Sequence, residues 1–342
     1  MSNFAAIIPA ATTPLVVQEV EIYTPGPQEL VIKNEVIAFN PIEYKIAKYA
    51  VFPLEYPAII GSSFGGTVLS VGSGVTRFKV GDKVAAVKKL GANGNQYGSF
   101  QQYVVVNESL TSKVAPSVDV DVVASLTGNL PTVVGIFTGR LGLGKPSLEG
   151  SATVKDKKVL VYGGSSSVGS LAVQYVAQAG YTAITTSSPK NNAFVSKLGA
   201  AKIVDHTQDK DAVIKALVAE GPYDLVFDTI SLPTSTAITG QVVVAQGGGE
   251  LHVTLPTFGG PETLPTNVTR VFESWSASLF EEKNKGLAEW AFHEYLAQGV
   301  ASGRVIPLPI QKVEGGLKGV TTALGLLEKG VSGVKLVLDP RE

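Results

Sequence analysis

The chain of 342 residues contains no cysteine, and histidine occurs only three times, at His206, His252 and His293. Without a thiol the protein can form no disulfide, no thiolate nucleophile and no cysteine-ligated zinc site. The three histidines lie far apart in the sequence, so no motif predicts a metal site and we assign none. A site built from histidine and carboxylate ligands is the one metal-binding alternative left open.

Long apolar runs and an excess of one charge are also lacking. No apolar run approaches the roughly 18 residues that a membrane-spanning helix needs. The N-terminal residues MSNFAAIIPAATTP lack the basic start and apolar stretch of a secretory signal. The net charge is −1 and no long basic block occurs, which argues against nucleic acid as a partner. We therefore expect a cytoplasmic protein that binds neither a membrane nor nucleic acid.

The composition and length predict a globular protein of two domains. Hydrophobic residues make up 44% of the chain and charged residues 17%, which is ample for a packed core. Up to about residue 125 the sequence is β-rich, with valine- and isoleucine-rich runs at Glu29–Ala38, 66–71 and 100–106 separated by Gly, Pro and Asn. Gly81 and Asp82 predict a tight turn between two strands.

From about residue 155 short apolar strands alternate with helical patterns. The first strand is KKVLVYGG, followed by a helix over 167–179 that Gly180 stops. The strands TAITTS, KIVDH, DLVFDTI and GELHVTL follow, with helices NAFVSKLGA and DAVIKALVAEG between the earlier ones. The tail predicts a helix over 286–298, a strand, a helix around 316–330 and a last strand, KLVLD.

This alternation is typical of βαβ crossovers and of a Rossmann-type, doubly wound parallel sheet. We predict an α/β protein in which this sheet, over residues 126–280, is inserted in a β-rich domain formed by residues 1–125 and 281–342.

A glycine–serine loop, residues 163–169, joins the first strand of the predicted sheet to the first helix. A dinucleotide-binding turn must lie at this point, because glycines let the backbone approach a pyrophosphate and the helix N-terminus offers unpaired N–H groups. The strict GxGxxG pattern is broken by Ser166, which replaces the second glycine. Serine is small enough to keep the close approach, and its hydroxyl can donate to phosphate. The alternative is an ordinary turn between strand and helix.

The next strand of the unit indicates which cofactor the loop binds. An NAD enzyme usually has Asp or Glu about 20 residues beyond the loop to bind the ribose 2′-hydroxyl. Here the segment reads TTSSPKN, from Thr185 to Asn191, without an acid. Hydroxyl groups and Lys190 suit a 2′-phosphate instead, which predicts NADPH. A solvated loop with an incidental lysine is the alternative.

At these motifs the sequence resembles the zinc-free medium-chain dehydrogenases/reductases. The resemblance rests on GGSSSVGSLAVQYVAQAG, TTSSPKNNAFVSKLGAAKIVDH, NPIEYKIAKYAVFPLEYPAIIGSSFGG and the tail LLEKGVSGVKLVL, and it covers essentially the whole chain. The sequence is most similar to the fungal quinone-oxidoreductase-like group that includes trans-acting enoyl reductases of polyketide synthesis. The resemblance implies that the β-rich domain is a GroES-like catalytic domain. In one departure, Ser63 stands where the family usually has an Asp.

The resemblance also implies roles for individual residues. The pyrophosphate loop corresponds to Gly164, Ser165, Ser166, Ser167, Val168 and Gly169. Contacts to the 2′-phosphate correspond to Ser187 and Lys190, and His206 falls where many relatives have a tyrosine near the adenosine phosphate. Asn40 and Lys45 lie in the block that lines the nicotinamide cleft in the family, and Lys335 matches a basic position that can approach the cofactor.

The implied activity is metal-free hydride transfer from NADPH to an activated C=C bond (enoyl, enone or enal) or to a quinone. The oxygen that becomes negative must be stabilised or protonated. Candidates are Tyr49 and Tyr44, with Lys45 as an electrostatic partner. Packing roles for both tyrosines, with water as the proton donor, are the alternative.

Other functions remain open, namely a metal-free aldehyde or ketone reductase and a non-catalytic NADPH-binding scaffold. The expected partner is a small-molecule substrate, a carrier-protein-bound polyketide among the possibilities, and the expected assembly is a monomer or a homodimer.

Overall fold

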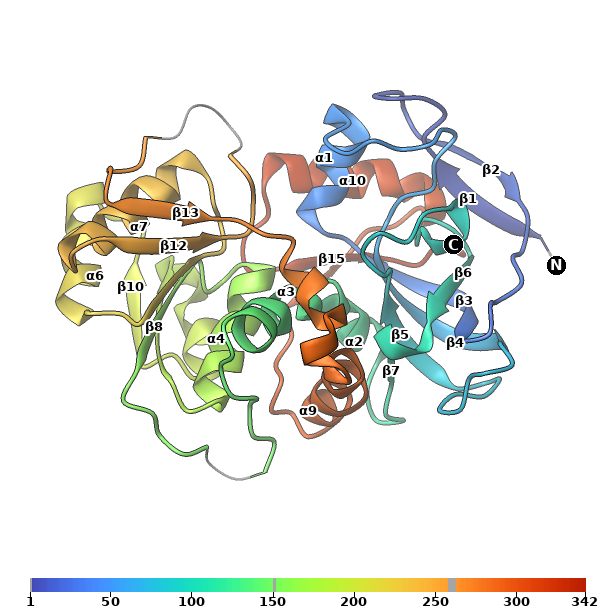
Figure 1. Ribbon diagram of the computed structural model, residues 1–342. Coiled ribbons are helices and arrows are strands. Elements are labelled where there is room, and N and C mark those ends of the chain that lie inside the picture. Colours follow the sequence, from blue (N-terminus) through green and yellow to red (C-terminus); the bar gives the residue numbers. More distant parts are fainter. Residues whose placement is uncertain (1, 150–151, 258–262) are drawn as a thin grey trace. The chain divides into compact units, whose positions relative to one another are not determined.

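A computed structural model describes residues 2–149, 152–257 and 263–342 (Figure 1). The chain divides into two compact units: the first comprises Met1–Pro131 and Lys285–Glu342, and the second comprises Thr132–Asn284. The domain boundaries drawn from the sequence, at 125/126 and 280/281, stay a prediction.

The second unit contains a six-stranded, wholly parallel sheet in the order β10-β9-β8-β11-β12-β13. Its strands are β8 (Lys158–Tyr162), β9 (Thr182–Ser187), β10 (Lys202–Asp205), β11 (Leu225–Asp228), β12 (Gly249–Val253) and β13 (Val268–Val271). In chain order this is 3-2-1-4-5-6, the strand order of the dinucleotide-binding Rossmann fold. The predicted doubly wound sheet is therefore confirmed.

Helices cover both faces of this sheet. The α-helices of the second unit are α3 (Leu130–Val134, which begins at the unit boundary), α4 (Ser167–Gln178), α5 (Asn192–Val195), α6 (Lys210–Glu220) and α7 (Pro233–Ala245). A π-helical turn at Gly135–Arg140 and 3₁₀ turns at Pro189–Asn191, Ser196–Leu198, Trp275–Phe280 and Glu282–Asn284 complete the unit. On one face Leu160 and Val226 pack with Leu217 of α6 and Val242 of α7. On the other face Phe137 stacks on Tyr175 of α4.

The first unit is built on a seven-stranded sheet and a two-stranded sheet. The larger sheet has the order β14-β15-β3-β4-β5-β7, with β6 also paired to β3, and only β14 and β15 are parallel neighbours. Its strands are β3 (Glu29–Ala38), β4 (Ser63–Val71), β5 (Lys83–Val87), β6 (Tyr103–Asn107), β7 (Thr111–Lys113), β14 (Ile310–Lys312) and β15 (Lys335–Leu338). The smaller sheet pairs β1 (Asn3–Ile7) with β2 (Val16–Val20). The predicted β-rich unit, which both ends of the chain build, is confirmed.

Strand β15 positions a C-terminal segment against an N-terminal one. Val337 pairs with Ala38 at the end of β3, and the N–H of Phe39 donates to the carbonyl of Leu336 at 3.0 Å. This register brings Lys335 beside Asn40, although 295 positions separate them in the sequence.

The helices of the first unit include two that the sequence patterns did not predict, at Pro41–Tyr49 and Val120–Thr127. The helices of this unit are α1 (Pro41–Tyr49), α2 (Val120–Thr127), α8 (Leu287–Glu289), α9 (Ala297–Ala301) and α10 (Val320–Lys329), with a π-helical turn at Trp290–Leu296 and 3₁₀ turns at Asn95–Tyr97, Glu108–Leu110 and Gly316–Gly319. A start signal for α1 is present, because Asn40 precedes Pro41 at the first helical position and Glu43 stands three residues after Asn40. That spacing could have revealed the helix.

Helix α7 was also missed, for a different reason. Its sequence PTSTAITGQVVVA is rich in Thr and Val, which have a low intrinsic helix propensity. Its buried face includes the polar residues Ser235, Thr236 and Thr239, so no apolar stripe of period 3.6 marks it. The predicted helix over 286–298 is observed as the run α8–α9, which extends to Ala301.

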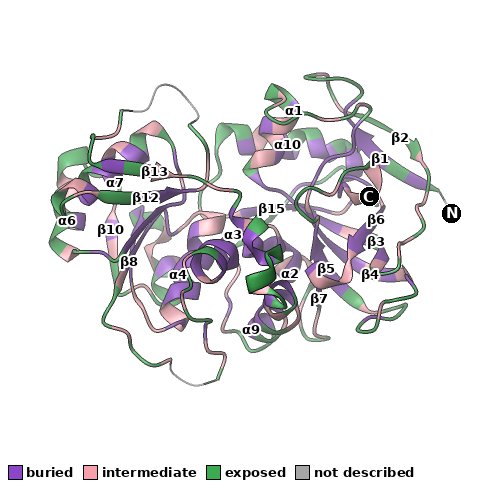
Figure 2. Ribbon diagram, viewed as in Figure 1, coloured by how far each residue is buried: buried purple, intermediate pink, exposed green. Residues whose placement is uncertain are grey.

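Burial follows the central strands of both sheets (Figure 2). In the first unit Leu30, Ile32, Phe64 and Val104 form one apolar core between strands, and a second core joins α1 and α10 to β1 and β15. Among the described residues no single helix is long and apolar enough to cross a membrane, and only the bent pair Val120–Thr127 and Leu130–Arg140 meets those criteria together.

Candidate cofactor site and a buried polar cluster

The glycine–serine loop lies at the carboxyl end of β8, where the sheet order reverses. Strand β8 ends at Tyr162 and α4 begins at Ser167, and β8 has β9 on one side and β11 on the other. Ligands of open α/β sheets bind outside the carboxyl ends of the strands at this reversal. The loop therefore occupies the position expected of a dinucleotide site.

Close contacts with neighbouring atoms explain two of the glycines in the loop. A Cβ atom on Gly164 would lie 2.3 Å from the hydroxyl oxygen of Thr185, and one on Gly169 would lie 2.1 Å from the carbonyl oxygen of Gly163. Real Cβ atoms do not approach other atoms so closely, so any larger residue would displace the loop or the start of α4.

Four of the seven backbone amides of the loop have a hydrogen-bond partner. The N–H of Gly163 donates to the hydroxyl of Thr186 and the N–H of Gly164 to its carbonyl, both at 2.9 Å. The N–H of Ser166 donates to the carbonyl of Gly163 at 2.9 Å, and that of Gly169 donates to the Ser166 hydroxyl at 3.0 Å. Three amides have no hydrogen-bond partner among the described residues: those of Ser165, Ser167 and Val168. Unpaired N–H groups at the start of a twelve-residue helix suit a pyrophosphate, so the residues present fit a dinucleotide.

Ser166 is bonded within the protein. Its hydroxyl oxygen accepts the N–H of Gly169 at 3.0 Å, which caps α4, and lies 2.9 Å from the hydroxyl oxygen of Thr229. Sequence reasoning missed Thr229, and no sequence signal links it to the loop, because it follows β11. Two hydroxyls of the TTSSPK segment, which the sequence predicts to suit a 2′-phosphate, have partners within the protein. The Thr186 hydroxyl accepts the N–H of Gly163, and the Thr185 hydroxyl donates to Val161 at 2.6 Å.

The end of β9 presents basic groups. Lys190 is exposed and has no hydrogen-bond or ion-pair partner among the described residues. His206 is exposed at the end of β10, and its N–H donates to the carbonyl of Ser187 at 3.4 Å. Ser187 itself is buried, and its hydroxyl donates to the carbonyl of Ser188 at 3.1 Å. The first acidic residue after Lys190 in the sequence is Asp205. The side-chain and backbone hydrogen bonds that Thr207 donates to it lower the pKa of its carboxyl group.

A separate polar cluster, which we call the Asn40 cluster, lies in the first unit and consists of Asn40, Glu43, Ser62, Ser63 and Lys335. The Asn40 side chain is at its centre. Its amide nitrogen donates to the hydroxyls of Ser62 at 3.1 Å and Ser63 at 3.0 Å. Its amide oxygen accepts from the ammonium group of Lys335 at 2.7 Å. Ser63 thus replaces the family's Asp with a neutral acceptor that is completely buried.

Glu43 holds the other side of the cluster. One carboxylate oxygen accepts the N–H of Asn40 at 2.8 Å, and the other accepts the N–H of Ser62 at 3.0 Å and its hydroxyl at 2.9 Å. Asn40 therefore bridges Glu43 and Lys335, two oppositely charged residues that are 1% and 2% exposed. Glu43 was not singled out from the sequence.

Burial shifts both ionisable groups of this cluster toward neutrality. It lowers the pKa of Lys335 to about 8, against the favourable negative charge of Glu43. It raises the pKa of the Glu43 carboxyl, against hydrogen bonds from Asn40 and Ser62 and the positive charge of Lys335. Their opposite charges and their hydrogen bonds to Asn40 and Ser62 offset the cost of burying both groups.

The three candidate catalytic residues lie on α1 but outside this cluster. Tyr49 is 50% exposed, and its hydroxyl donates to the carboxylate of Glu328 on α10 at 3.0 Å. Lys45 is buried, which lowers its pKa, and its ammonium nitrogen lies 5.9 Å from the centre of the Tyr44 ring. Burial, the main cause, raises the pKa of Tyr44. The structure therefore groups Asn40 with Lys335 and does not group Tyr49 with either.

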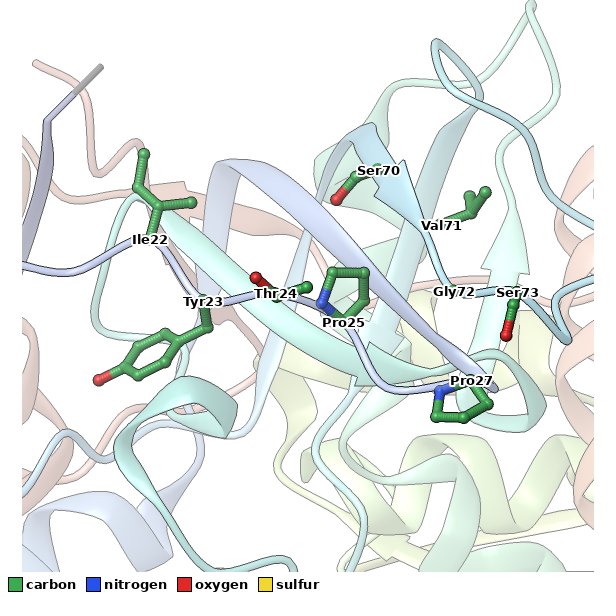
Figure 3. A pocket seen from close by; sticks show the side chains of 9 residues that line it. All are labelled: Ile22, Tyr23, Thr24, Pro25, Pro27, Ser70, Val71, Gly72 and Ser73. Carbon is green, nitrogen blue, oxygen red and sulfur yellow. The ribbon is translucent and has the colours of Figure 1, made fainter.

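A cavity of about 580 Å³ in the first unit involves none of these residues. It is lined by the segment before β3 and by the end of β4 (Figure 3): Ile22, Tyr23, Thr24, Pro25, Pro27, Ser70, Val71, Gly72 and Ser73. Val71 pairs with Leu30 at the start of β3, whereas Ser63 pairs with Ala38 at its end. The cavity and the Asn40 cluster thus lie at opposite ends of the same two strands.

Among the described residues no group of three or more His, Cys, Asp or Glu side chains is arranged to hold a metal ion.

Comparison with known proteins places both units in recognised families. Residues 26–116 match the alcohol dehydrogenase GroES-like domain, and residues 167–281 match the family described as zinc-binding dehydrogenase. A trans-enoyl reductase of Aspergillus japonicus is 34% identical over 313 residues, which cover 91% of this chain and 89% of that protein.

Two solved structures share the fold at low sequence identity. A quinone oxidoreductase of Pseudomonas syringae has a TM-score of 0.72 at 22% identity, over 99% of this chain and 100% of that one. A mycobacterial protein complexed with NADPH has a TM-score of 0.75 at 22% identity, again over 99% and 100% of the two chains.

Proposed function

The chain belongs to the medium-chain dehydrogenase/reductase superfamily, as an oxidoreductase related to fungal trans-enoyl reductases, and from this premise we propose that it is an NADPH-dependent reductase of activated C=C bonds. Enoyl, enone and enal compounds are the proposed acceptors, with quinones as a second class. The superfamily uses NAD(P)H, and a structural neighbour was solved with NADPH.

One observation carries the choice of NADPH. Three unpaired amides lie at the start of α4, and the basic residues Lys190 and His206 follow the ends of β9 and β10, while the TTSSPK segment has no acid. The amides suit the pyrophosphate that NADH and NADPH share. The basic groups suit the 2′-phosphate that only NADPH has, because a cation stabilises its charge. Asn40 and Lys335 are proposed to hold the nicotinamide side of the cofactor.

Bound NADPH supplies the hydride for the reduction. The protein's own residues must then stabilise or protonate the acceptor oxygen as it becomes negative. The phenolic O–H of Tyr49 donates a hydrogen bond to Glu328, and Lys45 is a buried amine beside Tyr44. We propose Tyr49 or Tyr44 as the proton donor and Lys45 as the group that stabilises the negative charge.

A spectrophotometric screen of NADPH oxidation tests the reaction class. We expect turnover with an enoyl thioester, an enone or an enal, and slower or no turnover with simple aldehydes and ketones. Turnover of aldehydes or ketones alone would make the protein a carbonyl reductase. NADPH binding without turnover of any acceptor would make it a non-catalytic binding protein. Comparing an enoyl group on coenzyme A with the same group on an acyl carrier protein tests whether the substrate arrives on a carrier.

A further inference from the structure

The hydroxyl of Ser166 takes part in two hydrogen bonds whose directions can be assigned. Its oxygen accepts the N–H of Gly169 at 3.0 Å and lies 2.9 Å from the hydroxyl oxygen of Thr229. A hydroxyl carries a single proton, so the contact with Thr229 has one donor and one acceptor. Which residue donates decides whether Ser166 has a proton available for a phosphate.

Thr229 uses its proton elsewhere. Its hydroxyl donates to the carbonyl of Tyr162 at 2.8 Å, with the carbonyl of Gly163 as a longer acceptor at 3.4 Å, and a carbonyl oxygen can only accept. Ser166 is therefore the donor to Thr229. The result is a directed chain, from the N–H of Gly169 to Ser166, from Ser166 to Thr229, and from Thr229 to the end of β8.

Thr229 is itself held firmly. It is 8% exposed, its N–H donates to the same Tyr162 carbonyl at 3.1 Å, and its own carbonyl accepts the hydroxyl of Thr254 at 3.2 Å. The N–H of Thr254 donates in turn to the hydroxyl of Ser231 at 2.8 Å. Thr229 thus connects the loop to the carboxyl ends of β8, β11 and β12.

We propose that Thr229 is a positioning residue for the cofactor site, which fixes the glycine–serine loop through Ser166 so that backbone amides alone bind the pyrophosphate. This inference rests on the proposed NADPH site. It assigns Ser166 no hydrogen bond to phosphate and gives it a structural task that glycine cannot perform. Consequently Ser166→Gly, which restores the usual dinucleotide-binding pattern, weakens cofactor binding.

Binding measurements with Thr229 and Ser166 variants test this inference. Thr229→Val keeps the shape of the side chain but removes every hydrogen bond of the hydroxyl, and Thr229→Ser keeps the hydroxyl. We expect Thr229→Val and Ser166→Gly to raise the Kd for NADPH about 5- to 10-fold, the size expected for one or two neutral hydrogen bonds. Thr229→Ser should stay within about twofold. The loss should be equal for NADH and NADPH, because the pyrophosphate is common to both.

A matched control is Thr111→Val, which removes another buried threonine hydroxyl, one that donates to Asn107 at 3.0 Å in the first unit. It should leave both Kd values unchanged. The inference would be overturned if Thr229→Val bound both cofactors as tightly as the wild type does, or if Ser166→Gly bound them more tightly. It would also be overturned if Thr229→Ser bound them as weakly as Thr229→Val.

Hydrogen exchange without cofactor separates this inference from the proposed function. In the unliganded protein, the amides of residues 163–170 should exchange faster in Thr229→Val and Ser166→Gly than in wild type or Thr229→Ser. If the wild type bound no NADPH, the proposed function would fail, yet faster exchange would still support the role of Thr229 in fixing the loop. Unchanged exchange in a wild type that binds NADPH would reject that role and leave the function standing.

Discussion

The Asn40 cluster in the first unit and the glycine–serine loop in the second unit hold polar groups by different means. The cluster buries two charged residues: Glu43, which accepts the backbone N–H of Asn40, and Lys335, which donates to the Asn40 side-chain oxygen. The loop contains no charged side chain and is held by the hydroxyls of Thr186, Ser166 and Thr229. Losing the partner of a buried charge costs more free energy than losing the partner of a buried neutral hydroxyl.

The two regions also differ in what they leave unpaired. In the cluster each side chain has at least one hydrogen-bond partner inside the unit. In the loop three backbone amides have none among the described residues. A region with unpaired donors is suited to receive an anion, while a region with satisfied groups is suited to fix the backbone around it. The cluster fixes the start of α1, the helix that also carries the candidate catalytic tyrosines.

The largest expected effect is on the free energy of unfolding, and it compares the loss of a buried charge with the loss of a buried hydroxyl. Glu43→Gln leaves Lys335 without its counter-charge, so we expect it to lower the free energy of unfolding by roughly 3–5 kcal/mol. Thr185→Val, which removes a buried neutral hydrogen bond beside the loop, should lower it by only about 0.5–1.5 kcal/mol. Urea unfolding measures both, and exposed Glu55→Gln is the control for the loss of a carboxylate. Equal losses at Glu43 and Thr185 would contradict the comparison.

The next effect concerns the exposed side of the same helix. If Tyr49 donates the proton, Tyr49→Phe lowers kcat by about 10²-fold with little change in the Kd for NADPH. Tyr97→Phe is matched, because the Tyr97 hydroxyl also donates to a glutamate of the first unit, Glu29, at 2.8 Å. Steady-state kinetics on both variants gives the answer. A kcat equal to that of wild type would assign Tyr49 to packing and leave Tyr44 or water as the donor.

In the second unit the charge predicted to determine the choice of cofactor is that of Lys190, after the end of β9. Lys190→Ala should weaken NADPH binding by about 10- to 100-fold and leave NADH nearly unaffected, because a charged hydrogen bond contributes roughly 1.5–3 kcal/mol. Exposed Lys197→Ala, in the same unit, is the control. Titration of both cofactors decides between the outcomes: equal losses would give Lys190 a structural role, and a wild type that prefers NADH would refute the choice of cofactor.

The buried lysine predicts a smaller, pH-dependent effect. Burial lowers the pKa of Lys335 in the folded protein to about 8, below its ordinary value of 10.5 in the unfolded chain. Between these values the unfolded state binds more protons, so the contribution of Lys335 to the free energy of unfolding rises with pH. Unfolding curves of wild type and Lys335→Met from pH 7.5 to 10 measure it. The free energy of unfolding of the wild type should rise with pH relative to that of Lys335→Met. A difference between the two that stays constant with pH would show that the pKa of Lys335 is not lowered.

No effect at all is expected from removing metal. Activity should be the same with and without a strong chelator, and elemental analysis should find far less than one metal ion per chain. The reason is the absence of cysteine together with the separated histidines. About one bound metal per chain, lost together with activity on chelation, would contradict a metal-free mechanism in either region.

Much of the fold follows from local patterns. The run Glu29–Ala38 was delimited correctly because it is bounded by turn residues and rich in β-branched side chains. Strand β8, the loop and α4 were recognised because a short apolar strand, glycines and a helical period occur in sequence. Helix α7 was not predicted because polar residues such as Thr236 and Thr239 lie on its buried face, and α1 was not predicted although its capping residues are visible in the sequence.

The sequence by itself determined the strand–helix alternation, the loop and its glycines, and the lack of an acid after β9, because each depends on residues close together in the chain. Only the tertiary structure decided the partners of the polar side chains. Thr229 meets Ser166 across 63 positions and Lys335 meets Asn40 across 295, because strand order and register bring them together. The sequence does not distinguish a hydroxyl or an amine that binds a phosphate from one that bonds to a buried carbonyl. Only the fold determines which of these partners the group has.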